Sequence, residues 1–366
     1  MKREGQLRSA LIFGGAGFIG SNWAHHLITN SEAQVHIFDN LSRPKVQFNL
    51  RWLEKAAQNT NRLKVTIADI RDAAAVRKAV STATDIYHFA AQVAVTTSLD
   101  DPRNDFEINA AGTLNILEAA RQCGNHPFVL FTSTNKVYGN LGASQFEDAL
   151  RIFAHRPGIC EAQPLDFHSP YGCSKGTADQ YVHDYCRIYG LPTVVFRMSC
   201  IAGPRQFGTE DQGWVAHFLY SALQGRTISI YGDGRQIRDV LAVQDLLCAF
   251  AAAYENRERT AGQIYNVGGG RNNTISLLEF LACMERMLHK DIQYSFLPTR
   301  PGDQPIYITD FSKLQKHVGW SPRFSVQQTV KSIRDWWEEN QECFAPLVFP
   351  LRPSKVAMGI LGEVAS

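Results

Sequence analysis

Short apolar runs alternate with amphipathic stretches along the first two hundred residues. The runs are rich in β-branched and aromatic residues and occur at 10–13, 35–38, 63–67, 86–89, 128–131 and 192–197. Between them, apolar residues recur at helical spacing, and we expect helices over 110–122 and 171–189. Strands that alternate with helices over this length predict right-handed βαβ units and an α/β fold with a doubly wound parallel sheet.

The alternation loosens after residue 200, where Gly and Pro cluster in "AGPRQFG" and "YGDGRQ". We therefore expect a nucleotide-binding domain over 1–198, with returns to the sheet near 240–268, and a smaller interleaved C-terminal domain over 199–345 that binds substrate. The tail at 346–366 has three prolines and little periodicity, and the sequence assigns it no role.

Composition narrows the class of protein. The 366 residues are 45% hydrophobic and 20% charged with a formal net charge of +2, which is ordinary for a globular protein and gives no electrostatic reason to expect nucleic acid. No apolar run approaches membrane-spanning length. Eight scattered cysteines lack a C-x-x-C pair or any short metal-ligand spacing, so we expect reduced thiols, no metal site and a cytoplasmic location.

A glycine motif, "IFGGAGFIGS" at 12–21, directly follows the first predicted strand and opens a predicted helix. It contains both the G-x-G-x-x-G and the G-x-x-G-x-x-G spacing, formed by Gly14, Gly15, Gly17 and Gly20. Glycine lets the backbone turn tightly and approach a pyrophosphate, while the helix N-terminus offers unpaired N–H groups. In this context the motif predicts the phosphate-binding turn of a Rossmann dinucleotide site rather than a plain glycine turn.

The second predicted strand ends in Asp39, about twenty residues after the glycines, where a carboxylate accepts hydrogen bonds from a ribose. A 2′-phosphate would meet this negative charge, so the pattern favours NAD over NADP, although Arg43 leaves NADP as an alternative. Strand ends and turns nearby complete the expected cofactor site with Phe18, Ile19, Asn40, Ser42, Asp69, Ile70, Ala90, Ala91 and Gln92.

The stretch "SPYGCSKGTADQY" places Tyr171 and Lys175 four residues apart at the start of a predicted helix, so both side chains lie on one face. A free tyrosine, with a pKa of about 10, is a weak base at neutral pH. A neighbouring ammonium and a positively charged nicotinamide would both favour the phenolate. Thr134 in "TSTNKVYG" ends the fifth predicted strand and can hydrogen-bond the substrate oxygen that Tyr171 deprotonates.

With a nicotinamide cradle, a hydroxyl and a Tyr–Lys pair in this order, the chain resembles the extended short-chain dehydrogenase/reductase family of sugar-nucleotide epimerases and dehydratases, over nearly its whole length to about residue 340. The resemblance implies that Thr134, Tyr171 and Lys175 are catalytic and that Asn109 helps to hold the site. The same resemblance implies that Asn109, Tyr171 and Lys175 contact the cofactor. It also implies that Arg238 and Arg300 clamp a substrate diphosphate, and that helices 110–122 and 171–189 form the four-helix bundle of a homodimer.

Family members that eliminate water carry an Asp-Glu pair after the catalytic hydroxyl, where this chain has Asn135 and Lys136. An amide cannot donate and accept a proton in turn, and a charged lysine does not replace a carboxylate base, so dehydration is disfavoured. A simple epimerase needs only a hydride transfer and one hydroxyl proton, with the cofactor regenerated in each turnover.

Longer stretches such as "DFEINAAGTLNILEAARQ", "STNKVYG", "LDFHSPYGCSKG" and "DQGWVAHF" resemble the CDP-paratose (CDP-tyvelose) 2-epimerase branch, which implies oxidation and reduction at C2 of a CDP-linked dideoxyhexose. Side chains expected to line the sugar-nucleotide site, besides Asn135 and Lys136, are His168, Cys200, Arg205, Gln206, Gln212 and Trp214. The alternatives are a sugar-nucleotide 4-epimerase, a 4,6-dehydratase, a net dehydrogenase, and a regulator that senses NAD(P) without turnover.

Overall fold

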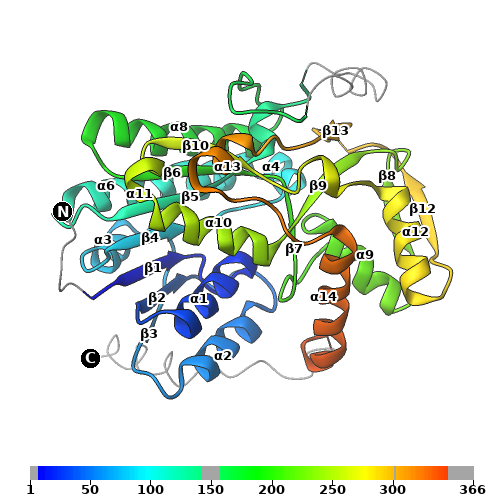
Figure 1. Ribbon diagram of the computed structural model, residues 1–366, viewed down its shortest axis with the longest axis horizontal. Coiled ribbons are helices and arrows are strands. Elements are labelled where there is room, and N and C mark those ends of the chain that lie inside the picture. Colours follow the sequence, from blue (N-terminus) through cyan, green and yellow to red (C-terminus); the bar gives the residue numbers. More distant parts are fainter. Residues whose placement is uncertain (1–6, 142–156, 301, 345–366) are drawn as a thin grey trace.

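A parallel sheet of seven strands forms the centre of the protein in the computed structural model, which describes residues 7–141, 157–300 and 302–344 (Figure 1). The expected tail at 346–366 lies outside these residues. The strands run in the order β10-β6-β5-β4-β1-β2-β3. Their bounds are β1 (Ser9–Phe13), β2 (Gln34–Asp39), β3 (Leu63–Ile67), β4 (Asp85–His88), β5 (Phe128–Thr134), β6 (Thr193–Met198) and β10 (Gln263–Val267). The predicted doubly wound parallel sheet is confirmed.

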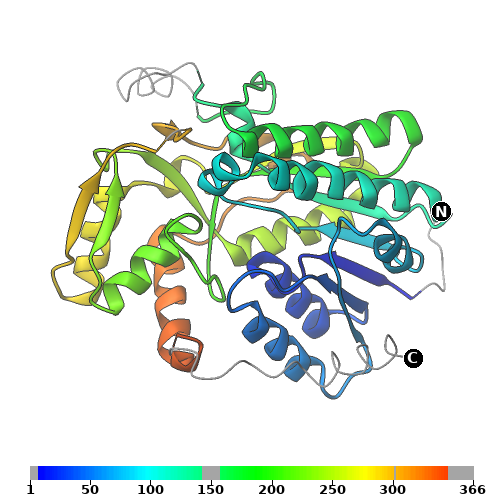
Figure 2. The same ribbon diagram turned by 180° about the vertical axis from the view of Figure 1, so that it is seen from behind.

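Alternation along the strands explains why both faces of the sheet are covered. In β1, Ala10 and Ile12 face one apolar cluster, while Leu11 and Phe13 face another. The first cluster packs under α1 (Phe18–Asn30), α2 (Val46–Ala57) and α10 (Val243–Glu255); the second packs under α3 (Ala73–Val80), α6 (Gly112–Gln122) and α8 (Pro170–Tyr189). Figure 2 shows α6 and α8 side by side on the second face. Because the sheet is buried on both faces, apolar residues follow one another along its strands, which explains the continuous apolar runs in the sequence.

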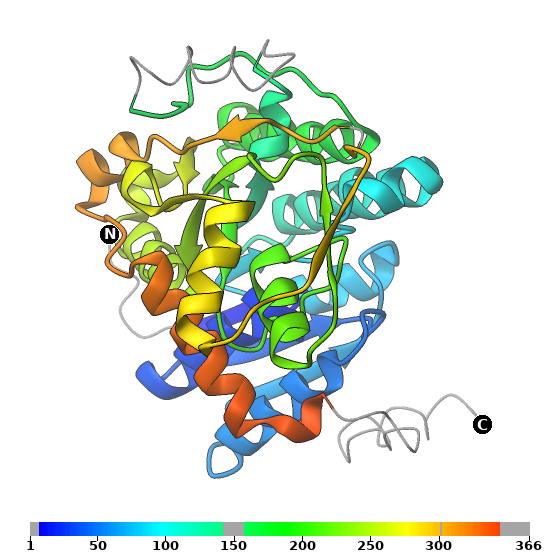
Figure 3. The ribbon, with the colours of Figure 1, turned by 90° about the vertical axis from the view of Figure 1, so that its right-hand side faces the viewer.

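A smaller set of elements packs beside the carboxyl ends of the strands, as Figure 3 shows from that side. A mixed sheet pairs β9 with β7, β11 and β13, and a two-stranded parallel sheet joins β8 to β12. These strands are β7 (Cys200–Ala202), β8 (Ile228–Tyr231), β9 (Ile237–Ala242), β11 (Thr274–Ser276), β12 (Tyr294–Leu297) and β13 (Ile306–Tyr307). The helices here are α9 (Trp214–Leu223), α12 (Leu277–Leu288), α13 (Ser312–Val318) and α14 (Val326–Glu339). Between β9 and β10 the chain returns through α10 to the central sheet.

Short helices join the larger elements: α4 (Val95–Asp100), α5 (Pro102–Phe106), α11 (Arg257–Thr260) and three 3₁₀ turns, η2 (Asn135–Tyr138), η3 (Arg271–Asn273) and η4 (Gln341–Cys343). The helix expected over 110–122 begins earlier, with a π-helical turn, η1 (Glu107–Ala111), that continues into α6. Such turns are frequent at functional sites. In the described part of the chain, no helix is both long and apolar enough to span a membrane.

Candidate active site

The glycine turn between β1 and α1 has room for glycine alone at two positions. A Cβ on Gly20 would lie 2.2 Å from the carbonyl oxygen of Gly14, and one on Gly14 would lie 2.6 Å from the backbone nitrogen of Ala90. Gly14 also has a φ of 74°, in the left-handed region. The close backbone approach leaves open space above the N-terminus of α1, the place where a pyrophosphate binds in such turns.

Asp39 ends β2 directly beside this turn. Its carboxylate accepts hydrogen bonds from the backbone nitrogens of Ala16, at 3.0 Å, and Leu41, at 2.8 Å. Burial raises the pKa of Asp39, and the backbone hydrogen bonds from Leu41, Ala16 and Gly17 oppose that shift. The carboxylate is therefore fixed at the rim of the glycine turn.

A cavity of about 180 Å³ extends from the glycine turn across the strand ends. Most residues expected to bind the cofactor line it: Gly14, Gly17, Phe18, Ile19, Gly20, Asp39, Asn40, Ser42, Arg43, Asp69, Ile70, Ala90 and Ala91. Gly15, Gln92, Asn109, Tyr171 and Lys175, which were also expected to bind the cofactor, do not line it. A Cβ on Gly15 would meet Ile37, and the backbone of Gln92 holds Asn109 in place instead. The cavity lies at the point where the strand order reverses, which is where sheets of this kind bind a dinucleotide.

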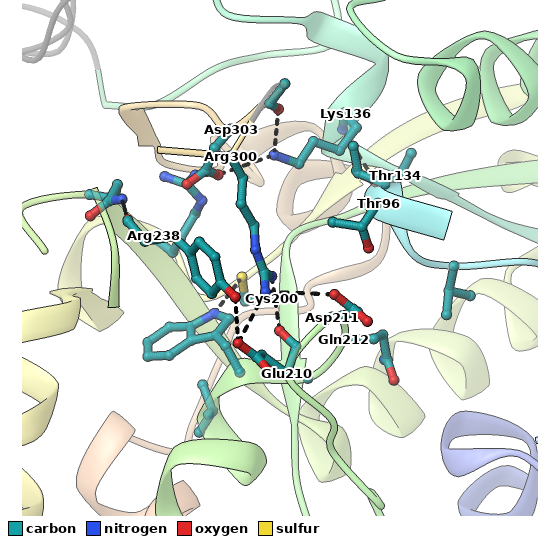
Figure 4. A pocket seen from close by; sticks show the side chains of 18 of the residues that line it. Thr96, Thr134, Lys136, Cys200, Glu210, Asp211, Gln212, Arg238, Arg300 and Asp303 are labelled. Atoms are coloured by element: carbon teal, nitrogen blue, oxygen red, sulfur yellow. Dashed lines mark hydrogen bonds and ion pairs between the residues drawn. The ribbon is translucent and has the colours of Figure 1, made fainter. Parts of the chain in front are cut away.

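A second cavity, of about 330 Å³, lies between the central sheet and the smaller set of elements (Figure 4). Val93 and Gln212 line both cavities, so the two spaces adjoin. The second cavity contains most of the expected catalytic and substrate positions: Thr134, Asn135, Lys136, Tyr171, Cys200, Gln206, Gln212, Trp214, Arg238 and Arg300. Residues from segments more than 160 positions apart in the sequence thus share one space.

Thr134 and Tyr171 meet at the wall of the second cavity. Thr134 is the last residue of β5 and caps η2, while Tyr171 lies in the first turn of α8. The Thr134 hydroxyl donates to the side-chain oxygen of Asn135 at 3.4 Å and is also close enough to Tyr171 to influence its pKa. Burial raises the pKa of Tyr171 to about 12, although the Thr134 hydrogen bond and the charge of Arg43 act in the other direction. The protein's own groups therefore shift this pKa upwards, opposite to the direction that the sequence analysis expects from Lys175.

Lys175 lies one turn along α8, behind Tyr171 rather than at the cavity wall. Its ammonium donates to the carbonyl of Thr132 at 2.7 Å and sits 4.2 Å from the centre of the Phe131 ring. Burial lowers the pKa of Lys175 to about 7, and the charges of Asp179 and Asp105 limit that decrease. The lysine is thus close to a change of charge at neutral pH.

Arg238 of β9 lines the cavity and forms an ion pair with a carboxylate that was not predicted as a site residue. Its guanidinium donates to Asp303 at 2.7 Å, and Lys136 lies 3.5 Å from the same carboxylate. Lys136 also donates to the carbonyl of Gly302, and burial lowers its pKa. Asp303 lies three residues after Arg300 in the motif "TRPGDQ". This short distance in sequence from a predicted site residue is the feature that could have indicated Asp303.

Arg300 faces the cavity with its charge directed at a loop before α9. It donates to the carbonyl of Glu210 at 2.9 Å, and its guanidinium is 3.6 Å from the carboxylates of Glu210 and Asp211. The guanidinium also stacks 3.6 Å from the Tyr231 ring centre. Neither acid was predicted as a site residue, because nothing in the string "TEDQGW" indicates a contact with an arginine ninety residues further on.

Two expected substrate residues are not among those lining the cavity. His168 is exposed and pairs with Asp166 at 2.8 Å. Arg205 stacks on Trp52 of α2, 3.6 Å from the ring centre, and contacts Trp336 of α14, so it joins the two parts of the fold. Cys200 does line the cavity and accepts a hydrogen bond from the Trp214 indole at 3.4 Å.

Comparisons with known proteins agree with this geometry. A family model described as GDP-mannose 4,6 dehydratase matches residues 11–333. The CDP-paratose 2-epimerase of Salmonella typhi is 40% identical over 336 residues, covering 89% of this chain and 98% of that protein. The UDP-glucuronic acid 4-epimerase of Bacillus cereus, solved with UDP-glucuronic acid and NAD, has a TM-score of 0.78 at 26% identity, covering 90% of this chain and 99% of that one. The dTDP-glucose 4,6-dehydratase of Streptomyces venezuelae, solved with NAD bound, has a TM-score of 0.78 at 27% identity, covering 91% and 98%.

Proposed function

Because this chain belongs to the GDP-mannose 4,6-dehydratase family of extended short-chain dehydrogenases/reductases, we propose that it is an NAD-dependent epimerase that inverts C2 of a CDP-linked hexose. The resemblance expected from the sequence is confirmed, and the chain is an enzyme of sugar-nucleotide chemistry. The likeness to the Salmonella typhi enzyme supports both the nucleotide and the carbon. The eight cysteines all lie in the described residues as free thiols, in keeping with the cytoplasm as its location.

One observation carries the choice of an epimerase over a dehydratase. The Thr134–Tyr171 pair adjoins Asn135 and Lys136, and both of these are held by other residues. The Asn135 amide donates to Gln304 at 3.0 Å, while Lys136 contacts Gly302 and Asp303. Neither can act as the carboxyl acid and base that elimination of water requires at these positions.

We assign the proton transfer to Tyr171 and the binding of the sugar oxygen to Thr134. Tyr171 takes the proton of the C2 hydroxyl as the C2–H bond breaks, and returns a proton when the opposite face of the ketone is reduced. NAD, when bound at the glycine turn and Asp39, supplies the reversible hydride acceptor. Lys175 adds positive charge behind Tyr171, and Arg238 and Arg300 are oriented to bind phosphate oxygens after exchanging their carboxylate partners.

The deciding experiment identifies the cofactor released on denaturation, then follows native enzyme with a panel of CDP-, UDP- and dTDP-hexoses in ordinary and deuterated water by NMR. We expect released NAD and inversion at C2 of a CDP-hexose. No solvent deuterium should appear at carbon, because the hydride returns from the cofactor.

Other outcomes have distinct meanings. Deuterium at carbon would replace hydride return by proton abstraction, and loss of water would reassign the enzyme as a dehydratase. Turnover of UDP- or dTDP-sugars alone would overturn the CDP assignment, and inversion at C4 would overturn the choice of C2.

We also propose that the enzyme is a homodimer built on α6 and α8. The outer face of α8 exposes Tyr181, Ile188 and Tyr189, with exposed fractions of 46%, 63% and 50%, which is a large apolar surface for one helix. Arg121 of α6 stacks 5.0 Å from the Tyr189 ring centre, so the two helices form one continuous face. Pairing this face across a two-fold axis would make an isologous four-helix contact.

Replacing Ile188 by aspartate is expected to convert the dimer to a monomer at micromolar concentration, because the carboxylate would be desolvated in the contact. Light scattering with size exclusion measures the mass. Tyr294→Asp, on the exposed strand β12 of the other part of the fold, is the matched control and should stay dimeric. A wild-type enzyme that is monomeric under these conditions would refute the proposal.

A further inference from the structure

We propose that Asp105, which lines neither of the two cavities described above and has no part in the chemistry above, is a positioning residue that keeps Lys175 charged and fixes the pH range in which the Tyr171–Lys175 pair works. The inference rests on the proposed function for its activity readout. It concerns a buried carboxylate whose surroundings connect three elements: α5, the π-helical turn η1 and α8.

Asp105 is fully buried one turn before the π-helical turn. One oxygen accepts a hydrogen bond from the Asn109 amide at 3.1 Å, and the other accepts one from the hydroxyl of Ser174. Ser174 directly precedes Lys175 on α8 and also contacts the Asn109 amide at 3.1 Å. The carboxylate is thus hydrogen-bonded only to neutral groups among the described residues, although it is buried.

Asn109 extends the same network towards the cofactor cavity. Its amide oxygen accepts from the backbone nitrogen of Gln92, and its amide nitrogen donates to the backbone carbonyl of Gln92, both at 3.0 Å. The segment that includes Gln92 also contributes Ala90, Ala91 and Val93 to the cavity wall. Asp105 therefore sits where the cofactor wall and the helix carrying Tyr171 and Lys175 are joined.

The charges around Lys175 leave Asp105 as a carboxylate that no other cation neutralises in the described residues. Asp179 also faces Lys175, but Arg197 holds it through two hydrogen bonds of 2.9 and 2.8 Å. His88 of β4 also interacts with Lys175, and burial together with the charge of Lys175 lowers its pKa well below the usual value, so it adds no charge at neutral pH. Burial raises the pKa of Asp105, whereas the Ser174 hydrogen bond and the charge of Lys175 oppose that shift and favour the carboxylate.

The direction of the effect follows from the sign of the charge. A negative charge near Lys175 raises its pKa against the effect of burial, and the same charge raises the pKa of Tyr171. Arg43 faces Tyr171 from the cofactor side and lowers its pKa. Removing the charge of Asp105 therefore lowers the pKa of both groups, so the activity profile should move to lower pH as a whole.

The test compares the pH profile of kcat/KM for the full-length holoenzyme and for Asp105→Asn, which keeps the shape of the side chain. We expect both limbs to move to lower pH by about one unit, with about a tenfold loss on the alkaline side. Asp100→Asn, at an exposed position just before α5, is the matched control and should leave the profile unchanged. A reduced rate with unmoved limbs would mean that Asp105 only supports the fold, and would overturn the proposal.

Two further measurements keep the proposal testable. Ser174→Ala removes one hydrogen bond to Asp105 but leaves the charge of Asp105 in place. Both limbs of the pH profile of this variant should therefore stay where they are, even if its rate falls. Limbs that move as they do in Asp105→Asn would overturn the charge effect. If the wild-type enzyme turns over no CDP-hexose, the proposed function fails, and an NMR titration of the Lys175 ammonium decides the inference alone. A midpoint that is lower in Asp105→Asn supports it, and an unchanged midpoint refutes it. This titration also serves as the readout if Asp105→Asn is folded but inactive.

Discussion

Replacing Tyr171 by phenylalanine is expected to lower kcat about 10²- to 10⁴-fold and to change KM less than about threefold. The hydroxyl is the group at the cavity wall that can take the proton of the sugar hydroxyl, and it lies within hydrogen-bonding reach of Thr134. The ring fills the same buried space in the variant, so the site and the fold should be preserved. The measurement is the initial rate of C2 inversion, together with the NAD content of the purified protein.

Tyr294→Phe is the matched control for this variant, because it removes a hydroxyl from an exposed position on β12, outside both the site and the proposed dimer contact. Its rate should equal that of the wild-type enzyme. A Tyr171→Phe enzyme that keeps more than about a tenth of the wild-type kcat would refute the role given to the hydroxyl, and would direct attention to Lys136, which follows Thr134 and Asn135 at that wall. Loss of bound NAD in the variant would instead indicate a role in holding the cofactor.

The Tyr171 hydroxyl has a higher pKa than a free tyrosine, so catalysis requires positive charge near it that lowers this pKa. Burial dominates at Tyr171, and Lys175 directs its ammonium at the carbonyl of Thr132. Positive charge from Arg43, and from an oxidised nicotinamide when it is bound, opposes the effect of burial. The rate should therefore depend on cofactor and tyrosine being together in the same buried site.

The parts of this site that could be predicted from sequence are those encoded by short, contiguous patterns. The glycine turn, Asp39 at a strand end and the Tyr171–Lys175 spacing each depend on local backbone geometry, and strand ends of a parallel sheet meet at one edge. Thr134 followed from the same rule, because β5 ends beside β4 and β6.

The parts that could not be predicted depend on contacts between distant segments. Arg205 was expected in the substrate site from its motif, but it stacks on Trp52 of α2 instead. The sequence around Arg205 does not predict this contact, because Trp52 lies far away in the chain. Likewise, the contact of Arg238 with Asp303 joins positions 65 residues apart. The sequence analysis assigned no role to Asp105, which becomes buried where α5 and η1 pack on α8.

Replacing Asp179 by asparagine is expected to lower the free energy of unfolding by about 3–5 kcal/mol. Asp179 and Arg197 are almost completely buried, and they join α8 to β6 through a bidentate pair. Arg197 continues to the Tyr138 hydroxyl at 3.0 Å, and that hydroxyl donates to Asn266 of β10 at 2.8 Å. The variant keeps the shape of the side chain but leaves the guanidinium buried without its counter-charge, so the loss reflects an unpaired charge rather than a cavity.

Urea denaturation followed by circular dichroism measures this loss, with Asp335→Asn as the matched control. Asp335 pairs with Lys331 at 2.5 Å and with Arg334 at 2.9 Å on the exposed side of α14, where solvent screens the charges. Removing that carboxylate should change the free energy of unfolding by less than about 1 kcal/mol. Equal, small losses in both variants would mean that water reaches Arg197. In that case α8 would be held on the sheet by its apolar residues alone, and the position of Tyr171 would not depend on the Arg197 pair.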